Sequence, residues 1–277
     1  MRPDRVRSVL YLPASNARAV EKARTLPCDV AVLDLEDAVA PEAKAEARAA
    51  AVAAIRRGGF GPRLAVRING LDTPWGEADL AALAGTGLSL VVAPKVESAQ
   101  TVRALSDGLR DGVRLWAMIE TPRALADLGP VVGAGGALDG LMIGVNDLAK
   151  TLGTGPSADR EPFKPWLAMI VAAARAHGLL AIDGVFNHIG DEAGFAAEAA
   201  QGRLFGFDGK SLIHPSQIAA ANAAFSPTEA EVARARAIVA AFAAPDARDQ
   251  GVIRIDGEMV ERLHLAQAEA LLARAPS

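Results

Sequence analysis

The stretch DVAVLDLEDAVAP places three acids, Asp34, Glu36 and Asp37, close together at the end of an apolar run. Carboxylates grouped in this way can bind a metal ion, transfer a proton or cap the helix that follows. If the apolar run is a strand, alternation puts Asp34 and Glu36 on one face and Leu33 and Leu35 on the other. The spacing alone leaves the three roles open.

Two further acids follow apolar runs later in the chain. Glu120 comes directly after RLWAMI, and Asp147 follows GLMIGV. Two carboxylates, completed by water and substrate oxygens, are a ligand set that Mg²⁺ accepts. Acids at strand ends also cap helices, so capping stays an alternative to metal binding.

Arg67, in the stretch VRING, is a charged residue inside an apolar run. A buried cation requires an anionic partner. The partner is either the carboxylate of a substrate, held by the planar guanidinium, or the carboxylate of Glu36 or Asp37. The residue types do not decide between these two interpretations.

Short apolar runs typical of strands recur along the chain. The eight runs are SVLYLP (8–13), VAVLDL (30–35), RLAVRI (63–68), LSLVVAP (88–94), RLWAMI (114–119), GLMIGV (140–145), LLAID (179–183) and RLFGFD (203–208). Most are separated by Ala-rich segments with helical periodicity, such as 41–57, 97–109 and 162–178. This alternation predicts an α/β fold in which a parallel sheet closes into a TIM (β/α)₈ barrel.

A parallel barrel gathers at one rim the residues that follow its strands. The polar residues at or just after the third to eighth runs are Arg67, Lys95, Glu120, Asp147, Asp183 and Asp208. We therefore expect these side chains to converge at one rim and to form the active site.

Composition narrows the class of protein. The 277 residues are enough for one large α/β domain with a sizeable core. The formal charge of −4 gives no general attraction to nucleic acid or anionic membranes, and the N-terminal apolar stretch is too short to span a membrane. A single cysteine, Cys28, fits a reducing cytoplasm. The sequence contains neither the His and Cys cluster of a zinc site nor the Ser elbow of a hydrolase.

The C-terminal part of the chain differs from the rest. We expect the barrel to occupy residues 1–243, with APDARDQ (244–250) as a linker. The tail then shows a short β-like run, a turn at Asp256 and Gly257 and an amphipathic helix. Residues 244–277 are therefore predicted to form a helical arm that packs on its own barrel or reaches a neighbouring subunit.

Nearly the whole chain resembles the CitE-like branch of the HpcH/HpaI aldolase and citrate lyase β-subunit family. The matching stretches, in order, are RSVLYLPASNARAVEKA, DVAVLDLEDAVAPEAKAEAR, VRINGLDTPW, VAPKVES, MIETPRAL, GVNDLA, AIDGVF and GFDGKSLIHPSQI. In layout the chain is most similar to citramalyl-CoA and malyl-CoA lyases. The resemblance implies a TIM barrel and a Mg²⁺-dependent enzyme that makes or breaks a carbon–carbon bond beside a thioester.

The resemblance also implies roles for particular residues. The arginine of the VRIN motif is Arg67, which would bind a substrate carboxylate. The acids of the ET and ND motifs are Glu120 and Asp147, which would bind Mg²⁺, and Glu120 would also lie against the substrate. CoA contacts map onto the following residues: Tyr11, Arg18, Lys22, Ile182 and Asp183.

A third acid comes from the C-terminal arm. Where the lyases have a catalytic aspartate in a G-x-M-[IV]-D pattern, this chain has GEMVE, so the matching residue is Glu261. We expect Glu261 to transfer a proton, with its carboxylate moved by one methylene. The resemblance moves the metal away from the opening stretch, and Glu36 and Asp37 would then orient metal-bound water and balance Arg67. Asp34 is expected to be structural.

The resulting hypothesis is a carbon–carbon lyase that cleaves or forms a 3-hydroxyacyl-CoA, such as malyl-CoA or citramalyl-CoA. Its products would be acetyl-CoA and a 2-keto acid, either glyoxylate or pyruvate. The alternatives are a citrate lyase β subunit acting on an acyl-carrier protein, a malate or citramalate synthase that also hydrolyses the thioester, and a non-catalytic ligand-binding barrel. The resemblance further implies a homotrimer or hexamer.

Overall fold

A computed structural model describes residues 6–273, apart from 156, 158, 246, 248 and 249, and also residue 275. The chain divides into two compact units, Met1–Phe225 and Ser226–Ser277. Each unit has its own secondary structure, and each is considered by itself below. None of the described helices has the length and apolar character needed to cross a membrane.

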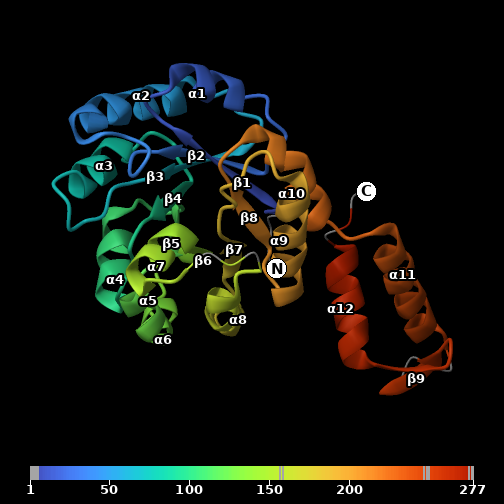
Figure 1. The fold of residues 1–277 in the computed structure, drawn as a ribbon. Helices are drawn as coiled ribbons and strands as arrows, with labels where there is room; N and C mark the ends of the chain where they lie inside the picture. The colour runs from blue at the N-terminus through green and yellow to red at the C-terminus, as the bar shows by residue number, and fades with distance from the viewer. Residues whose placement is uncertain are drawn as a thin grey trace. The chain divides into compact units, whose positions relative to one another are not determined.

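The first unit is a closed parallel barrel whose strands follow one another in sequence order (Figure 1). The strands are β1 (Ser8–Pro13), β2 (Val30–Asp34), β3 (Arg63–Arg67), β4 (Leu90–Ala93), β5 (Arg114–Ile119), β6 (Leu138–Ile143), β7 (Leu180–Asp183) and β8 (Gly209–Leu212). The predicted TIM-barrel fold is therefore confirmed.

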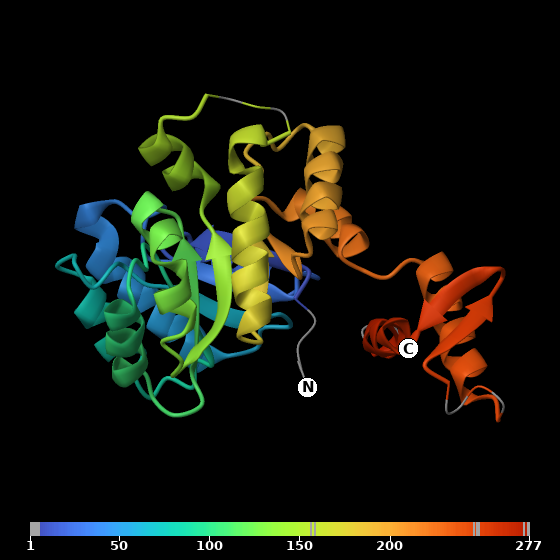
Figure 2. The same ribbon diagram turned by 90° about the horizontal axis from the view of Figure 1, so that it is seen from below.

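Helices surround the strands of this unit (Figure 2). They are α1 (Ala17–Ala23), α2 (Lys44–Arg57), α3 (Gly76–Leu83), α4 (Ala99–Gly108), α5 (Pro122–Ala126), α6 (Leu128–Val132), α7 (Val145–Leu152), α8 (Lys164–Ala176), α9 (Glu192–Phe205) and α10 (Ile218–Ala224). Short 3₁₀ turns, Pro41–Ala43, Glu161–Phe163 and Pro215–Gln217, precede α2, α8 and α10. Each of these turns has a proline within its first two positions, where a missing N–H costs no helical hydrogen bond.

The barrel wall separates two apolar layers. Val32 and Trp116 belong to a cluster inside the barrel, whereas Leu33 and Leu35 pack outward in the layer shared with the helices. This arrangement follows from strand geometry, because successive side chains point to opposite faces. Asp34 of β2 is level with its register partner on β3, Arg67, and both side chains lie on the inner face.

The eighth strand differs from the prediction. Residues 203–205 form the last turn of α9, which ends at Gly206 in a left-handed conformation, and β8 begins only at Gly209. A short apolar run such as RLFGF does not distinguish a strand from the end of a helix. Asp208 therefore precedes β8, where its carboxylate accepts a hydrogen bond from Arg175 at 2.9 Å. The expectation that Asp208 joins the active-site rim was wrong.

The second unit contains α11 (Glu229–Ala243), an antiparallel pair of strands and α12 (Arg262–Leu272). The two strands, β9 (Val252–Ile255) and β10 (Glu258–Glu261), meet at the turn expected at Asp256 and Gly257, where both residues have a positive φ. Because α11 belongs to the second unit, the boundary between the two compact units lies between Phe225 and Ser226, before residue 243. The domain ranges 1–243 and 244–277 stay a prediction, and three residues of the expected linker lie outside the described residues.

Candidate active site

A cavity of about 420 Å³ opens at the carboxyl ends of the barrel strands. Its polar lining includes Asp34, Asp37, Arg67, Glu120 and Asp147. Glu36 and Lys95 contact this group, and we refer to the seven charged residues together as the rim cluster. The cluster combines residues from β2, β3 and the segments after β4, β5 and β6, as strand-end counting predicted.

Arg67 is at the centre of the rim cluster. Its Nε and Nη2 atoms lie 2.7 and 2.6 Å from the two carboxylate oxygens of Asp34, which makes a bidentate pair. Its Nη1 atom lies 2.8 Å from Glu36 and 3.4 Å from Asp37. Burial alone would lower the pKa of Arg67, but the hydrogen bonds and charge of Asp34 outweigh burial and raise this pKa well above its ordinary value.

The partner of Arg67 within the chain is thus mainly Asp34, which sequence analysis assigned only a structural role. The carboxylate of Asp34 also accepts hydrogen bonds from the backbone N–H groups of Glu36 and Ala38, at 3.0 and 3.1 Å. Asp34 therefore fixes the orientation of the guanidinium and the path of the chain that carries Glu36 and Asp37.

Glu36 is buried between two cations. One carboxylate oxygen faces Arg67, and the other accepts a hydrogen bond from the ammonium group of Lys95. Burial raises the pKa of Glu36 above its ordinary value, and the charges of Arg67 and Lys95 oppose this shift only in part. A carboxylate with a raised pKa is a suitable proton acceptor.

Glu120 has one carboxylate oxygen without a hydrogen bond. Oε1 accepts the backbone N–H of Lys95 at 2.8 Å, whereas no donor of the described chain reaches the buried Oε2. Burial, together with the charges of Glu36 and Asp147, raises the pKa of Glu120 from 4.5 to about 7. A Cβ atom at Gly144 would come within 2.2 Å of Oε2, so only glycine leaves room for this carboxylate.

These features fit a divalent cation. The rim cluster contains five carboxylates and two cations, which leaves a formal charge of minus three when all are ionised. Asp147, in the first turn of α7, is half-buried and lines the same cavity as Glu120, and its charge raises the pKa of Glu120. No group of three or more His, Cys, Asp or Glu arranged for a metal occurs among the described residues. A pair of carboxylates completed by water and substrate oxygens is the kind of site that Mg²⁺ uses.

Tyr11 lines the cavity, whereas Ile182 is not among its lining residues. The ring of Tyr11 lies 5.0 Å from Cζ of Arg67, and its hydroxyl donates to Sδ of Met142 at 2.8 Å. Burial raises the pKa of Tyr11 far above its ordinary value, so the phenol stays neutral. Ile182 is fully buried in the apolar cluster inside the barrel. Contacts of these residues with CoA stay a prediction.

Asp183 does not join the rim cluster. Leu180 and Ile182 face the barrel interior, so Asp183 points outward, where its carboxylate meets Arg160 at 2.7 Å and Lys210 at 3.2 Å. Burial would raise the pKa of Asp183, but the two cations lower it below its ordinary value. The expected convergence was therefore wrong for this side chain, although the role of the segment in CoA binding stays a prediction.

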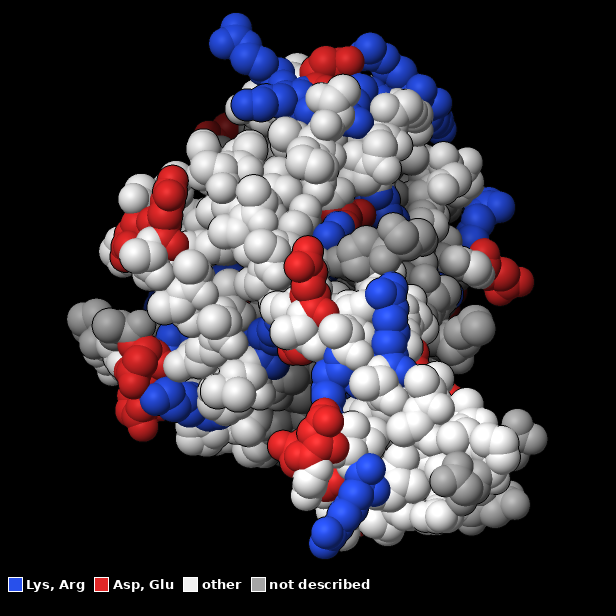
Figure 3. Space-filling view, turned by 90° about the vertical axis from the view of Figure 1, so that its right-hand side faces the viewer, with Lys and Arg blue, Asp and Glu red and all other residues white. Residues whose placement is uncertain are grey.

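Two other predicted residues, Arg18 and Lys22, are not among the residues that line the cavity. Arg18 and Lys22 are exposed on α1, and the structure shows neither side chain paired with an acid of the described chain. Lys and Arg side chains gather at the top of Figure 3, where Figure 1 shows α1 and α2. Glu261 belongs to the second unit, where it caps the N-terminus of α12 and its backbone N–H donates to Nδ1 of His264 at 2.9 Å.

Sequence analysis missed the network that supports the rim cluster from behind. The buried ammonium group of Lys44 donates to the carbonyl groups of Leu35 and Glu36 at 2.8 and 2.7 Å and to Oδ1 of Asn69 at 2.7 Å. Because Asn69 follows β3 and Lys44 begins α2, this network ties together the strand ends that carry Glu36 and Arg67. In the sequence, the only sign of this network was the presence of Lys44 soon after the acidic stretch.

Comparison with known proteins decides the family. The family model described as HpcH/HpaI aldolase/citrate lyase matches residues 7–215. The chain belongs to this family. The predicted resemblance to the CitE-like branch is therefore confirmed. The prediction that the chain is a CitE-like lyase is confirmed as well, because the family contains lyases.

The family includes relatives with different named activities. The chain is 44% identical over 270 residues to a (3S)-malyl-CoA thioesterase of Cereibacter sphaeroides, covering 97% of this chain and 94% of the relative. It is 36% identical over 304 residues to an L-malyl-CoA/β-methylmalyl-CoA lyase of the same species, covering 99% and 95%. The structure of CitE from Mycobacterium tuberculosis in complex with magnesium, acetoacetate and coenzyme A superposes with a TM-score of 0.82, at 35% identity and 99% coverage of both chains.

Proposed function

We propose that the protein is a Mg²⁺-dependent lyase that cleaves a malyl-CoA-like 3-hydroxyacyl-CoA into acetyl-CoA and a 2-keto acid. The observation that carries the proposal is the buried Oε2 of Glu120, which no donor of the described residues reaches and which lies among other carboxylates of the rim cluster. Family membership supports the coarser statement that the substrate is a thioester and the reaction involves a carbon–carbon bond.

Glu120 and Asp147 would hold the metal ion. When bound, Mg²⁺ would supply Lewis acidity to the oxygens of the substrate and stabilise the negative charge that develops on them. The neighbouring M. tuberculosis protein was solved with magnesium, which supports the choice of metal. Gly144 keeps the space around Glu120 open, so the chain itself reserves the position of this ligand.

Arg67 would bind the carboxylate of the substrate. Asp34 occupies one edge of the guanidinium at 2.6 and 2.7 Å, whereas the exposed Asp37 approaches Nη1 at 3.4 Å, the longest of its acidic contacts. A substrate carboxylate would displace Asp37 at this position, because that exchange breaks the weakest pair. Asp34 would keep the guanidinium oriented throughout.

Two glutamates would move protons. Glu36, with its raised pKa, would accept the proton of the substrate hydroxyl while the adjacent carbon–carbon bond breaks. The electron pair of that bond passes to the thioester fragment as an enolate, and the hydroxyl carbon becomes the carbonyl of the keto acid. Glu261, from the same or a neighbouring subunit, would then protonate the enolate to give acetyl-CoA. A homotrimer or hexamer would bring arms and barrels of different subunits together.

CoA would bind outside the cavity along α1. Arg18 and Lys22 are exposed there and offer positive charge for phosphate groups. Their spacing of four residues puts both side chains on the same face of the helix. The acyl chain would reach the rim cluster past Tyr11, which lines the cavity.

The test is an assay with purified protein, Mg²⁺ and three thioesters: malyl-CoA, citramalyl-CoA and β-methylmalyl-CoA. Two products are followed separately, the 2-keto acid by hydrazone formation and free CoA by its thiol. We expect keto acid to appear with at least one substrate and to disappear with EDTA. No keto acid from any of the three would contradict the proposal, and cleavage of a citryl thioester on an acyl-carrier protein would instead identify a citrate lyase β subunit.

Hydrolysis of the thioester is a second candidate, favoured by the 44% identity to a (3S)-malyl-CoA thioesterase. Glu261 in place of the lyase aspartate points in the same direction, because proton transfer depends strongly on placement. Release of free CoA and malate without glyoxylate would identify this activity. Release of malate from acetyl-CoA and glyoxylate would identify a synthase.

A further inference from the structure

The loop after β4 contains a residue with an unusual backbone conformation. Lys95 has a φ of 50°, and it is one of three residues other than glycine with a positive φ in the described chain. Such a conformation costs free energy for any residue with a Cβ atom and persists where surrounding contacts enforce it. The next residue, Val96, anchors the loop by donating its N–H to the carbonyl of Met118 at 3.3 Å.

Lys95 contacts two different acids of the rim cluster. Its backbone N–H donates to Oε1 of Glu120 at 2.8 Å, and its ammonium group donates to Glu36. Glu36 in turn pairs with Nη1 of Arg67 at 2.8 Å. In this left-handed conformation the backbone N–H of Lys95 faces Glu120 while its side chain reaches Glu36. Lys95 therefore links the proposed metal ligand to the proposed anion-binding arginine.

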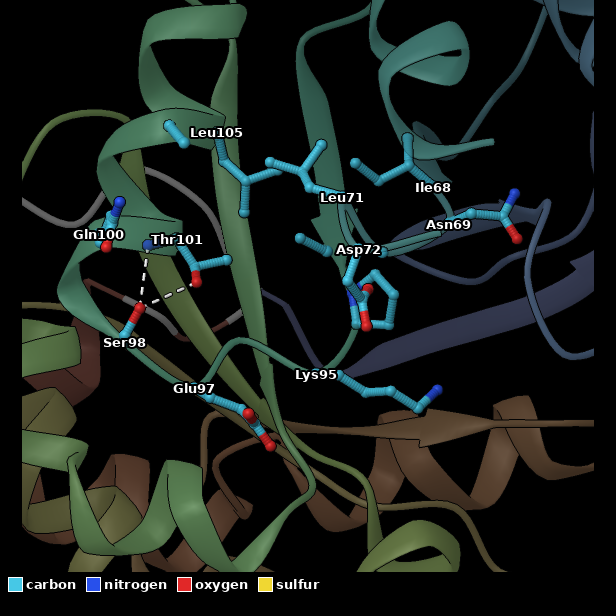
Figure 4. Close-up of a pocket in the computed structure, with 14 residues that line it drawn as sticks. Ile68, Asn69, Leu71, Asp72, Lys95, Glu97, Ser98, Gln100, Thr101 and Leu105 are labelled. Carbon is cyan, nitrogen blue, oxygen red and sulfur yellow. Dashed lines mark hydrogen bonds between the residues drawn. The ribbon is translucent and has the colours of Figure 1, made fainter. Parts of the chain in front are cut away.

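The side chain of Lys95 also borders a second cavity, of about 360 Å³, between the β3–α3 loop and the start of α4. Figure 4 shows it extending away from Ser98 and Thr101, which hydrogen-bond to each other. Burial would lower the pKa of Lys95, but its hydrogen bond with Glu36 and the charges of Glu36 and Glu120 raise that pKa instead. The ammonium group thus stays charged in a largely acidic surrounding.

We propose that Lys95 is a positioning residue that divides the rim cluster into a cation-binding half and an anion-binding half. Its backbone holds Glu120 toward the metal position, and its ammonium group neutralises Glu36 so that Arg67 remains available to an incoming carboxylate. The inference rests on the proposed function, because it assumes that Mg²⁺ and a carboxylate bind at these two halves.

Removal of the ammonium group should shift the two affinities in opposite directions. The cation-binding half becomes more negative, so Mg²⁺ should bind more tightly. Glu36, without its cation, should draw more strongly on Arg67 and repel a substrate carboxylate. A residue that merely stabilised the fold would weaken both kinds of binding together.

The test uses Lys95→Met, Lys95→Gly and Lys95→Arg in the full-length protein, with Arg110→Met as a control that removes a charge at the opposite end of the strands. Calorimetry measures binding of Mg²⁺ alone and of pyruvate at saturating Mg²⁺. For Lys95→Met we expect Mg²⁺ to bind at least threefold more tightly and pyruvate at least tenfold more weakly. Lys95→Arg should bind pyruvate within threefold of the wild type, and Arg110→Met should change neither affinity.

Metal-free melting temperatures give a readout that does not depend on ligands. Lys95→Gly should melt at a higher temperature than Lys95→Met, because both lack the ammonium group but only glycine adopts the φ of 50° without strain. Steady-state kinetics should show a higher KM for the thioester in both variants.

The proposal is overturned if either affinity shift of Lys95→Met is missing, if both affinities fall together, or if Lys95→Gly melts no higher than Lys95→Met. These outcomes are distinct from failure of the proposed function. If the wild type itself binds no Mg²⁺, the proposed function fails and the inference fails with it. If the wild type binds Mg²⁺ and the variants do not separate the two affinities, only the inference about Lys95 fails.

Discussion

Two clusters of buried charge lie at the strand ends of the same barrel and have different properties. The rim cluster opens into a cavity, has more carboxylates than cations and contains one oxygen of Glu120 that accepts no hydrogen bond from the described part of the chain. The second group, here called the outer cluster, lies on the helix side of β7 and β8. It consists of Arg160, Asp183, Glu198 and Lys210.

The outer cluster has equal numbers of acids and bases, and each acid forms ion pairs with the bases of the same cluster. Lys210 is fully buried and donates to Glu198 at 2.7 Å and to the carbonyl of Gly184 at 2.6 Å. A buried group of this kind needs all its partners to compensate for lost hydration. The comparison teaches that buried charge at a strand end is not in itself a sign of function. An uncompensated charge that faces a cavity is the feature that separates the two clusters.

The largest expected effect is on catalysis. Glu120→Gln keeps the shape of the side chain but removes its charge, so we expect kcat to fall by about 10³-fold or more. Stability of the metal-free protein should not fall, because the substitution removes a poorly compensated buried charge. Steady-state assays and urea unfolding measure the two quantities, with Asp111→Asn at the opposite rim as a control. Normal turnover of Glu120→Gln would contradict this account, because the uncompensated charge of the rim cluster would then have no role in catalysis.

The outer cluster should show the reverse pattern. Lys210→Met leaves Asp183 and Glu198 with one fewer cation in a buried position, and we expect a loss of about 3 kcal/mol in the free energy of unfolding. The fraction that remains folded should bind Mg²⁺ with unchanged affinity. Urea unfolding and calorimetry of the same preparation test both statements. A loss of Mg²⁺ affinity at full stability would show that the outer cluster belongs to the site.

The two clusters should also respond oppositely to pH. Glu120 has a folded-state pKa of about 7 against an ordinary 4.5, so its stabilising contribution is present below pH 4.5 and is lost as the pH rises through 7. Metal-free wild type should therefore lose about 2 kcal/mol relative to Glu120→Gln between pH 5 and pH 8. Asp183, with a lowered pKa, contributes stability at neutral pH that is lost only as the pH falls below its ordinary range. Urea unfolding across this pH range would contradict the account if wild type and Glu120→Gln changed in parallel.

A smaller effect is expected at the edge of the rim cluster. Glu36 contacts Arg67 and Lys95 rather than the metal position, so Glu36→Gln should weaken Mg²⁺ binding by about tenfold without abolishing it. The same variant should lose more in kcat than in Mg²⁺ affinity, because Glu36 is the proposed proton acceptor. Complete loss of Mg²⁺ binding would make Glu36 a metal ligand, and unchanged kcat would exclude its role in proton transfer.

The sequence was sufficient to predict the barrel and four of the seven residues of the rim cluster. Alternating apolar runs and Ala-rich segments defined the strands, and counting to their carboxyl ends brought four charged residues together: Arg67, Lys95, Glu120 and Asp147. The same counting failed for Asp183, because Leu180 and Ile182 face inward and the next side chain must face outward. It failed for Asp208 because a short apolar run also suits the end of a helix.

The remaining features depend on contacts that no local pattern encodes. Asp34 was expected to be structural, yet only the register between β2 and β3 shows that it faces Arg67. The contact of Lys95 with Glu120 is made from a left-handed backbone conformation, which a lysine rarely adopts. The space reserved by Gly144 depends on the distance between two neighbouring strand ends. Such features arise from tertiary packing.

The central claim is that the rim cluster is a metal site whose charge surplus rests on Glu120. The most direct measurement is a calorimetric titration of Mg²⁺ into metal-free wild type and Glu120→Gln at pH 7, repeated in two buffers of different ionisation enthalpy. Because burial raises the pKa of Glu120 to about 7, the account predicts that wild type binds Mg²⁺ and releases protons at this pH, whereas Glu120→Gln binds far more weakly and releases none. Equal binding by both proteins, or binding by the wild type without proton release, would contradict it.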